Sequence, residues 1–298
     1  MVRMNDGRKI LITGASGRLG STLHQAYAAR HLVLAPTRQE LDLSRPEKLA
    51  EILRPMDFDL CIHCAAITSP DVCEREPELA ERVNAQSPAV IASECQRRGA
   101  RLIHLSTDYV FGGEGDTPLS ESDATAPVST YGRTKLAAES AVLQACPSAL
   151  VARVSWLFGG AQACFPEQML AQARAGREVE AIGDKWSVPT CMDDIAVWLE
   201  LLWQQEPAVH GLLHLCNSGQ ATWQTFAQAA LDIAYEKGLL EQPVTVKGNR
   251  LEAFTGFLAK RPRYTPMANQ KLASLLGESP RSWQDALRAH LGRSALRL

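Results

Sequence analysis

Residues 9–20 of this chain read KILITGASGRLG, and this segment predicts its class of fold. The first five residues form a short apolar run of strand-forming residues, and Gly14, Gly17 and Gly20 follow directly. The apolar positions of a helix then begin, at Leu19, Leu23, Ala26 and Tyr27. Strand, glycine turn and helix are typical of a dinucleotide-binding loop, because glycines let the backbone approach a pyrophosphate that the helix N-terminus faces. The spacing is G-x-x-G-x-x-G rather than G-x-G-x-x-G, and an ordinary glycine-rich turn is the alternative.

The end of the second predicted strand, residues 31–35, bears on the choice of cofactor. An acidic residue at this point would bind the ribose hydroxyls of NAD, whereas an arginine suits the 2′-phosphate of NADP. The chain offers Arg38 and no acid before Glu40 and Asp42. We therefore expect NADP(H) as the preferred cofactor, with NAD(H) possible; the alternative is that Arg38 is a solvated loop residue.

Strands and helices alternate along the rest of the chain. Further strands are predicted at residues 59–66, 101–105, 151–155, 178–182 and 212–216. Helices are predicted at residues 46–53, 76–98, 165–175, 192–203, 223–235, 269–276 and 283–291, with another around residues 131–135. Alternation of this kind implies right-handed βαβ crossovers, so the expected fold class is α/β with a doubly wound, Rossmann-type parallel sheet.

Two domains of unequal size are expected. Residues 1–159, completed by about 191–216, would form the NAD(P)-binding Rossmann domain. Residues 160–298 would form a smaller, discontinuous C-terminal substrate domain, built mainly from 160–190 and 217–298. Ligands of a doubly wound sheet bind at the C-terminal ends of its strands, which is where the segments beginning at Cys64 and Ser106 must lie.

Tyr131 and Lys135 are the first candidates for catalysis. Residues four apart share one face of a helix, so the phenol and the ammonium would lie side by side. A nearby cation lowers the pKa of a tyrosine, which could then exchange a proton with a carbonyl oxygen. The alternative is a tyrosine and a lysine that share a helical face by chance.

Composition excludes two classes of partner. Lys and Arg number 31 against 33 Asp and Glu, so the net charge is −2, a poor match for binding nucleic acid. No apolar run reaches the roughly 18 residues of a membrane span, and the polar start does not resemble a signal peptide. We expect a cytoplasmic protein that binds neither nucleic acid nor membrane, and that is a monomer or homodimer.

The eight cysteines are scattered along the chain, which suits a reducing compartment. Cys61 and Cys64 form a CxxC pattern within a predicted strand, where side chains three apart point to opposite faces. They would not chelate one ion, and we expect no metal site.

Several segments together resemble one family. They read TGASGRLG at 13–20, LSTDYVF at 105–111, YGRTK at 131–135 and RVSW at 153–156. Later segments read DKWSVPT at 184–190, LHLCNSG at 213–219, TW at 222–223, RP at 261–262 and WQDAL at 283–287. Over nearly its whole length, the chain resembles the extended short-chain dehydrogenase/reductases, and within them the dTDP-4-dehydrorhamnose reductases.

The resemblance implies specific residue roles. Tyr131 is the acid that protonates the substrate oxygen, Lys135 lowers its pKa and holds the nicotinamide ribose, and Thr107 hydrogen-bonds the reacting group. The implied cofactor contacts are Gly14, Ser16, Gly17, Arg18, Leu19, Gly20, Arg38, Asp42, Leu43, Cys64, Ala65, Ala66, Ser106, Tyr131 and Lys135. The implied substrate contacts are Thr107, Asp108 and Trp156, to which we add Arg261 as a diphosphate ligand, with a plain surface arginine as the alternative.

The chain also departs from the family pattern. Family members often read Asp-Gln-Tyr-Gly where this chain reads DKWS at 184–187, and Asn-Ser after Arg-Pro where it reads RYT at 263–265. A strand-end asparagine is typical of relatives where this chain has His63-Cys64. Most of these departures bear on which sugar and base are bound rather than on the reaction. Tyr109 stands where the related dehydratases typically place a glutamate, which argues against dehydration.

The resemblance implies an NAD(P)H-dependent oxidoreductase that reduces the C4 ketone of a 4-keto-6-deoxy nucleotide sugar. The best single candidate is the conversion of dTDP-4-dehydro-L-rhamnose to dTDP-L-rhamnose. One alternative is a non-catalytic NADP-binding regulatory subunit like that of methionine adenosyltransferase, which keeps the tyrosine–lysine pair. Another is a reductase or epimerase of a different nucleotide sugar.

Overall fold

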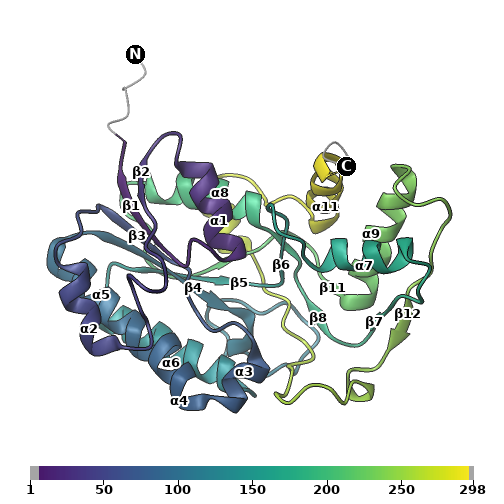
Figure 1. The fold of residues 1–298 in the computed structure, drawn as a ribbon, viewed down its shortest axis with the longest axis horizontal. Helices are drawn as coiled ribbons and strands as arrows, with labels where there is room; N and C mark the ends of the chain where they lie inside the picture. Colours follow the sequence, from purple (N-terminus) through teal and green to yellow (C-terminus); the bar gives the residue numbers. More distant parts are fainter. Residues whose placement is uncertain (1–6, 295–298) are drawn as a thin grey trace.

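A computed structural model describes residues 7–294 (Figure 1). Its centre is a six-stranded parallel sheet in the order β10-β5-β4-β3-β1-β2, which confirms the predicted fold class. The strands are β1 (Lys9–Thr13), β2 (Leu32–Leu34), β3 (Leu60–His63), β4 (Arg101–Thr107), β5 (Leu150–Val154) and β10 (Gly211–Leu215). In the sheet, β1 lies between β2 and β3, and the strand order reverses at this point. In a sheet of this kind a crevice opens there, between the C-terminal ends of β1 and β3.

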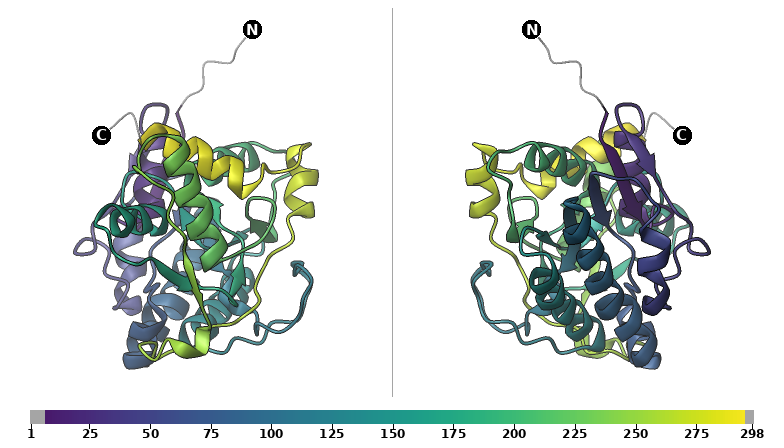
Figure 2. Two further views of the ribbon diagram at one scale, coloured as in Figure 1. Left: turned by 90° about the vertical axis from the view of Figure 1, so that its right-hand side faces the viewer. Right: turned by 90° about the vertical axis from the view of Figure 1, so that its left-hand side faces the viewer.

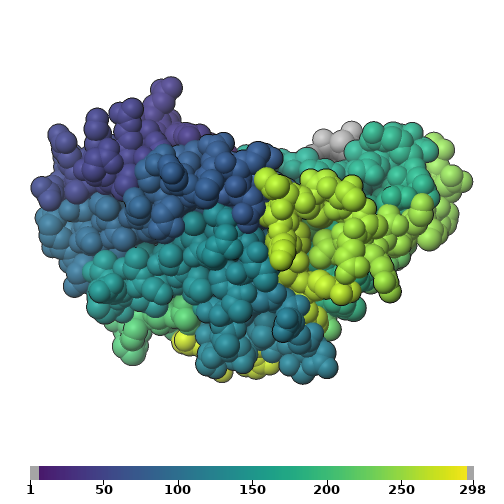
Figure 3. Space-filling view, turned by 90° about the horizontal axis from the view of Figure 1, so that it is seen from below, coloured from purple at the N-terminus to yellow at the C-terminus, as the bar shows by residue number. Residues whose placement is uncertain are grey.

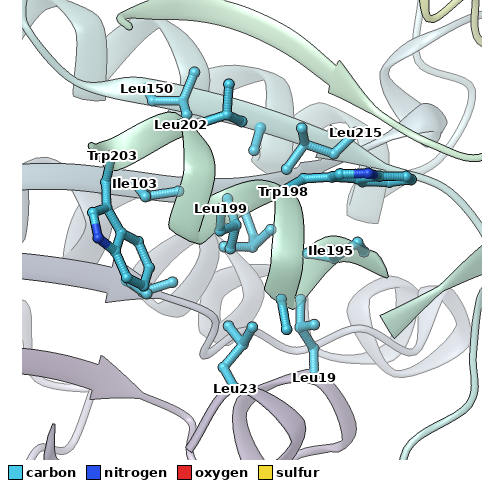
Figure 4. Packing of buried hydrophobic residues seen from close by; sticks show 14 of the residues in the cluster. Leu19, Leu23, Ile103, Leu150, Ile195, Trp198, Leu199, Leu202, Trp203 and Leu215 are labelled. Carbon is cyan, nitrogen blue, oxygen red and sulfur yellow. The ribbon is translucent and has the colours of Figure 1, made fainter. Parts of the chain in front are cut away.

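Helices cover both faces of the sheet. On one face lie α1 (Arg18–Tyr27) and α8 (Met192–Trp203), and on the other α2 (Pro46–Leu53), α5 (Ser87–Arg98) and α6 (Thr130–Ala145). Each face has its own apolar core. Figure 4 shows the first core, in which leucines of α1 meet Ile195, Leu199 and Leu202 of α8 against the sheet. The helices predicted at 46–53 and 192–203 are confirmed as α2 and α8.

One predicted helix, at residues 76–98, is corrected by the structure. It is divided into α4 (Pro77–Glu81), a π-helical turn η1 (Arg82–Gln86) and α5. Pro88 has no N–H, so the regular hydrogen-bond ladder cannot pass through it. The wider turn directs Asn84 inward, where its side-chain amide accepts from the Ile67 N–H at 2.8 Å and donates to the Ile67 carbonyl at 3.0 Å. This pair of bonds positions the segment that follows β3.

The second half of the chain builds two further apolar clusters beside the sheet. They are formed mainly by α7 (Phe165–Arg174), α9 (Trp223–Glu236) and α11 (Trp283–Ser294), with β7 (Glu180–Ile182) paired to β12 (Lys247–Asn249). Figure 2 shows α9 and α11 side by side. The domain boundaries given above stay a prediction.

Shorter elements connect the two halves. They are α3 (Pro70–Arg75), β6 (Leu157–Phe158) paired to β9 (Thr190–Cys191), β8 (Trp186–Ser187) paired to β11 (Ala221–Thr222), α10 (Gln270–Leu276), and the 3₁₀ turns η2 (Asp108–Val110) and η3 (Leu251–Ala253). Between residues 7 and 294, no helix is both long and apolar enough to cross a membrane.

A candidate active site at the strand ends

A cleft of about 780 Å³ opens at the C-terminal ends of the central strands. Every site residue predicted from the sequence lies on its wall. Additional lining residues, which sequence reasoning did not assign, include Thr37, Ser44, Thr68, Tyr109, Phe165, Gln168 and Trp223. β3 ends at His63 rather than at residue 66, so the next residues, Cys64 to Ala66, face the cleft instead of continuing the strand.

The glycine loop closes tightly over the end of β1. Gly14 has a φ of 68°, and a Cβ on it would lie 2.8 Å from the Cα of Ala65. A Cβ on Gly20 would lie 2.2 Å from the Gly14 carbonyl oxygen. Only glycine fits at these two positions, so the start of α1 at Arg18 is drawn close to the strand end. The helix N-terminus therefore faces the cleft, as a pyrophosphate site requires.

At the far end of the cleft, Arg38 is exposed and the two nearby acids are already engaged. Glu40 accepts from the Thr37 N–H at 2.7 Å, and Asp42 accepts from both the N–H and the hydroxyl of Ser44 at 2.9 and 2.7 Å. These hydrogen bonds lower the pKa of both carboxyls. Arg38 lines the cleft beside Asp42, whose pKa its charge also lowers, and its exposed guanidinium can meet a ligand there.

Tyr131 and Lys135 both reach the cleft from α6, but the expectation that Lys135 lowers the pKa of Tyr131 is wrong. Burial raises the pKa of Tyr131 above its ordinary value, although a hydrogen bond with Thr107 opposes the change. Lys135 Nζ instead donates to the Leu105 carbonyl at 2.7 Å and lies 3.2 Å from His104 Nε2. The cation is turned toward the strand, so burial dominates at the phenol.

Lys135 is itself perturbed. Burial lowers its pKa to about 8, against the opposing effects of Glu139 and Cys64. Glu139 lies one turn further along α6 and forms a buried ion pair with Arg153 of β5, at 2.9 and 2.7 Å. Ser106, predicted as a cofactor contact, donates its hydroxyl to Glu139 at 2.5 Å. Sequence reasoning missed Glu139, although its place four residues after Lys135 was a signal that both share a face.

Asp108 collects hydroxyl groups from distant segments. Its Oδ2 accepts from Ser187 and Thr265 at 2.7 Å each and from Ser155 at 3.1 Å, and Thr107 donates to Oδ1 at 3.2 Å. Ser187 and Thr265 both lie in segments that depart from the family pattern. The buried carboxylate therefore joins the end of β4 to segments of the second half of the chain.

Aromatic rings form one wall of the cleft. Trp156 has a backbone φ of 41°, which residues other than glycine rarely adopt. Backbone strain of this kind is common at functional sites. Its ring packs against Phe165, Trp223 and Phe226 with centroids 5.4, 5.7 and 4.8 Å away. Phe165 and Trp223 also line the cleft. Such a wall suits a flat ring such as a nucleobase.

Arg261 also lines the cleft and is paired with Asp71 of α3, at 2.8 and 3.2 Å. Asp71 also accepts from the Ala259 N–H at 2.8 Å. Figure 3 shows this yellow-green segment, around residue 260, against the blue surface that includes α3. The role of Arg261 as a diphosphate ligand stays a prediction, and binding would require an exchange of partners.

Among residues 7–294, one group of side chains brings three potential metal ligands close together. It consists of Cys164, Glu167 and His290. The Cys164 thiol donates to Glu167 at 2.8 Å, and His290 Nε2 lies 2.5 Å from the other carboxylate oxygen. A hydrogen-bond network accounts for this arrangement. All eight cysteines are free thiols.

The sequence of this chain is similar to those of known reductases. Residues 8–295 match the model of the RmlD substrate binding domain family. A dTDP-4-dehydrorhamnose reductase of Escherichia coli K12 is 38% identical over 237 residues, which is 77% of this chain and 79% of the relative. A probable dTDP-4,6-dihydroxy-2-methyloxan-3-one 4-ketoreductase of Streptomyces antibioticus is 36% identical over 93% of this chain and 92% of its own.

A solved structure is also similar. It is the dTDP-4-dehydrorhamnose reductase of Bacillus anthracis in complex with NADP, with a TM-score of 0.88 and 28% identity, covering 96% of this chain and 99% of that one. The sequence match, the fold and the cleft therefore lead to one conclusion: this chain belongs to the RmlD substrate binding domain family.

Proposed function

We propose that this chain is an NADPH-dependent reductase of the C4 ketone of a 4-keto-6-deoxy nucleotide sugar. The first candidate reaction is the reduction of dTDP-4-dehydro-L-rhamnose to dTDP-L-rhamnose. The observation that carries the proposal is that Thr107, Tyr131 and Lys135 converge in the same cleft as the glycine loop.

The proposed chemistry follows from the state of these side chains. Bound NADPH would supply a hydride to the ketone carbon, and the ketone oxygen then needs a proton. Burial raises the pKa of Tyr131, so its phenol carries a proton at neutral pH and is the acid in the direction of reduction. A Lys135 ammonium at the cleft would stabilise the phenolate left behind.

The cofactor preference rests on the far end of the cleft. Arg38 is exposed there, and Glu40 and Asp42 are engaged in hydrogen bonds of their own turns. A 2′-phosphate would meet the Arg38 cation, whereas the carboxylates that could bind the ribose hydroxyls of NAD are held within their own turns. The similar structure from B. anthracis was solved with NADP. NADH remains a possible second cofactor.

The substrate half of the cleft supports a nucleotide sugar. Trp156 and the rings packed on it offer a surface for the base, Arg261 offers a cation for the diphosphate, and Asp108 offers an acceptor for sugar hydroxyls. The E. coli and S. antibioticus relatives are both named for dTDP sugars. We also propose a cytoplasmic location, from the eight free thiols, and a monomeric or homodimeric state.

The test follows the absorbance of reduced nicotinamide with dTDP-4-dehydro-L-rhamnose generated in place, first with NADPH and then with NADH. Oxidation is expected with the wild type and a loss of at least about 100-fold in kcat with Tyr131→Phe, since proton transfer typically contributes that much. Tyr235→Phe is the control, because Tyr235 is an exposed residue of α9. Tight NADPH binding without turnover of any 4-keto nucleotide sugar would overturn the proposal and favour a regulatory subunit.

A further inference from the structure

Three buried polar side chains form one row across the central sheet. Thr13 is in register with His63, and His63 is in register with His104, so the three lie side by side on one face of β1, β3 and β4. Each is 1% exposed. Two residues earlier in the same strands, Leu11, Cys61 and Leu102 belong to the apolar core beneath α5 and α6. The row therefore replaces one apolar layer of that core.

The row ends at Lys135. Thr13 Oγ1 lies 2.7 Å from His63 Nδ1, and the same hydroxyl accepts from the Ala65 N–H at 3.3 Å. The two imidazole rings are stacked, with centroids 5.3 Å apart and planes inclined by 23°. Lys135 Nζ lies 3.2 Å from His104 Nε2, on the far side of the row from Thr13. The end of the glycine-loop strand is thus joined to the lysine in the cleft.

Both rings are neutral at physiological pH. Burial and the Lys135 ammonium lower the pKa of His63 to about 3 and hold that of His104 well below its usual range. A neutral ring that faces an ammonium must accept its hydrogen bond, so His104 Nε2 is the acceptor and Nδ1 carries the proton. That Nδ1, like His63 Nε2, has no partner within residues 7–294. Unpartnered buried groups are costly, and a benefit elsewhere is required to explain them.

We propose that His104, aligned by His63 and Thr13, is a positioning residue that holds the Lys135 ammonium in place and keeps it charged. The proposal rests on the proposed function and deepens it. A neutral imidazole supplies an acceptor without adding a negative charge that would draw the lysine out of the cleft. With the Leu105 carbonyl as the second acceptor, the third ammonium proton is left for the cofactor or the phenol.

The charged and titratable groups around Lys135 determine how its pKa would change if the acceptor His104 Nε2 were removed. Burial disfavours the ammonium, Glu139 on the same helix and Cys64 after β3 favour it, and the charge of Glu139 is shared with Arg153 of β5. Tyr131 on the same helix adds no charge while it is protonated. Because a hydrogen bond to the charged form favours that form, its removal lowers the pKa of Lys135 and moves deprotonation to lower pH.

The experiment measures NADPH affinity by fluorescence titration from pH 6 to 10, which requires no sugar substrate. In the wild type, affinity is expected to fall at high pH as Lys135 loses its proton. His104→Leu is expected to move the midpoint of that fall by about one pH unit toward neutrality, in proportion to the loss of one charged hydrogen bond. His104→Gln, whose amide oxygen can occupy the place of Nε2, is expected to restore the wild-type midpoint.

A matched control is His214→Leu. His214 is a fully buried histidine whose Nε2 is also unpartnered within the described residues. It lies on the edge strand β10, which β5 separates from β4, and its Nδ1 is bonded to the Ala268 carbonyl. It is expected to change stability without moving the pH midpoint. If His104→Leu does not fold, His104→Asn takes its place, because its shorter amide does not reach Nζ and the same shift is expected.

Two results would overturn the proposal: a wild-type affinity that does not fall at high pH, or a midpoint that is the same in the wild type and in the variants lacking the acceptor. A failure of the proposed function is a separate result, because it appears as absent turnover with every 4-keto sugar while NADPH still binds. Where turnover is present, the high-pH limb of kcat is expected to shift in the same direction.

Discussion

Arg38 is the exposed side chain to which we assign the choice of cofactor. Its guanidinium lies at the cleft end where the neighbouring acids are engaged in their own turns. We expect Arg38→Ala to raise the KM for NADPH about tenfold, which corresponds to about 1.4 kcal/mol, because a charged hydrogen bond to the 2′-phosphate is lost. The KM for NADH should change by less than about twofold. Arg45→Ala is the control, since Arg45 lies nearby but outside the cleft; equal effects on both cofactors would contradict the prediction.

Glu167 is expected to make the stability of the protein depend on acid pH. Burial would raise its pKa, but hydrogen bonds with His290 and Cys164 outweigh burial and lower the pKa from 4.5 to about 2. A group whose folded pKa is lowered contributes stability above pH 4.5, and this is lost as pH falls toward 2. We expect urea unfolding to reveal a contribution of about 2–3 kcal/mol at pH 6 that is absent near pH 2.

The control for that measurement is Glu167→Gln, which cannot ionise. Its stability should be lower at pH 6, and the difference from the wild type should shrink as pH falls from 4.5 to 2. A difference that stays constant over this range would assign the effect to packing rather than to the charge.

At the residue scale, the sequence predicted the side chains that belong to motifs and missed their partners. Tyr131 and Lys135 follow from their spacing on one helix, and Thr107 follows from the family resemblance of residues 105–111. Asp71 and Glu139 do not, because the partner of Asp71 lies 190 residues away and that of Glu139 lies on another element. The pKa of Tyr131 was mistaken for the same reason: the acceptors that turn Lys135 away, Leu105 and His104, are brought to it by the fold.

At the scale of elements, the approach of α6 to the turn η2 determines where Tyr131 lies. A Cβ on Gly132 would lie 2.2 Å from the Tyr109 carbonyl oxygen and 2.9 Å from the Cβ of Pro127. The first of these atoms is backbone and cannot move aside alone. We expect Gly132→Ala to destabilise the protein by about 1–3 kcal/mol. It should also lower kcat, because α6 would shift and carry Tyr131 with it.

Thermal unfolding and initial rates would check this prediction. Gly256→Ala is the matched control, because a Cβ on Gly256 meets nothing within 4 Å and the residue has no left-handed φ. It should leave both stability and kcat near wild type. Unchanged stability and rate in Gly132→Ala would mean that the contact with η2 does not position Tyr131.

Periodicity predicted whole elements better than their interruptions. α2 and α8 begin and end where apolar spacing and proline placed them, since such signals are local. The π-helical turn η1 was missed although Pro88 was visible, because a proline in the first turn of a helix is ordinary. The bonds of Asn84 to Ile67 that accompany the wider turn come from the tertiary fold and leave no local signal. The short strands β6, β8, β9 and β11 were also missed, because two-residue pairings leave no periodic signal.

At the scale of the whole molecule, the ion pair between Asp71 and Arg261 joins the two halves of the chain beside the cleft. The guanidinium is buried against the Phe257 ring, at 4.5 Å from its centroid, and hydrogen bonds with Arg261 lower the pKa of Asp71. A diphosphate carries more charge than one carboxylate, so it could replace Asp71 as the partner of Arg261. Substrate binding would then release the segment around residue 260 from α3.

This exchange predicts opposite effects for the two partners. Arg261→Ala should raise the KM for the nucleotide sugar by about 10–100-fold, as expected for the loss of about 1.4–2.7 kcal/mol from a charged contact, and should leave the affinity for NADPH unchanged. Asp71→Asn removes the competing charge, so it should lower the KM for the sugar or leave it unchanged. Initial rates at varied sugar concentration measure both, with binding of the free nucleoside diphosphate as a second readout. If Arg261 only joins the halves, the two variants should weaken substrate binding alike, because each breaks the same bridge; opposite signs are expected only if Arg261 exchanges its carboxylate for a phosphate.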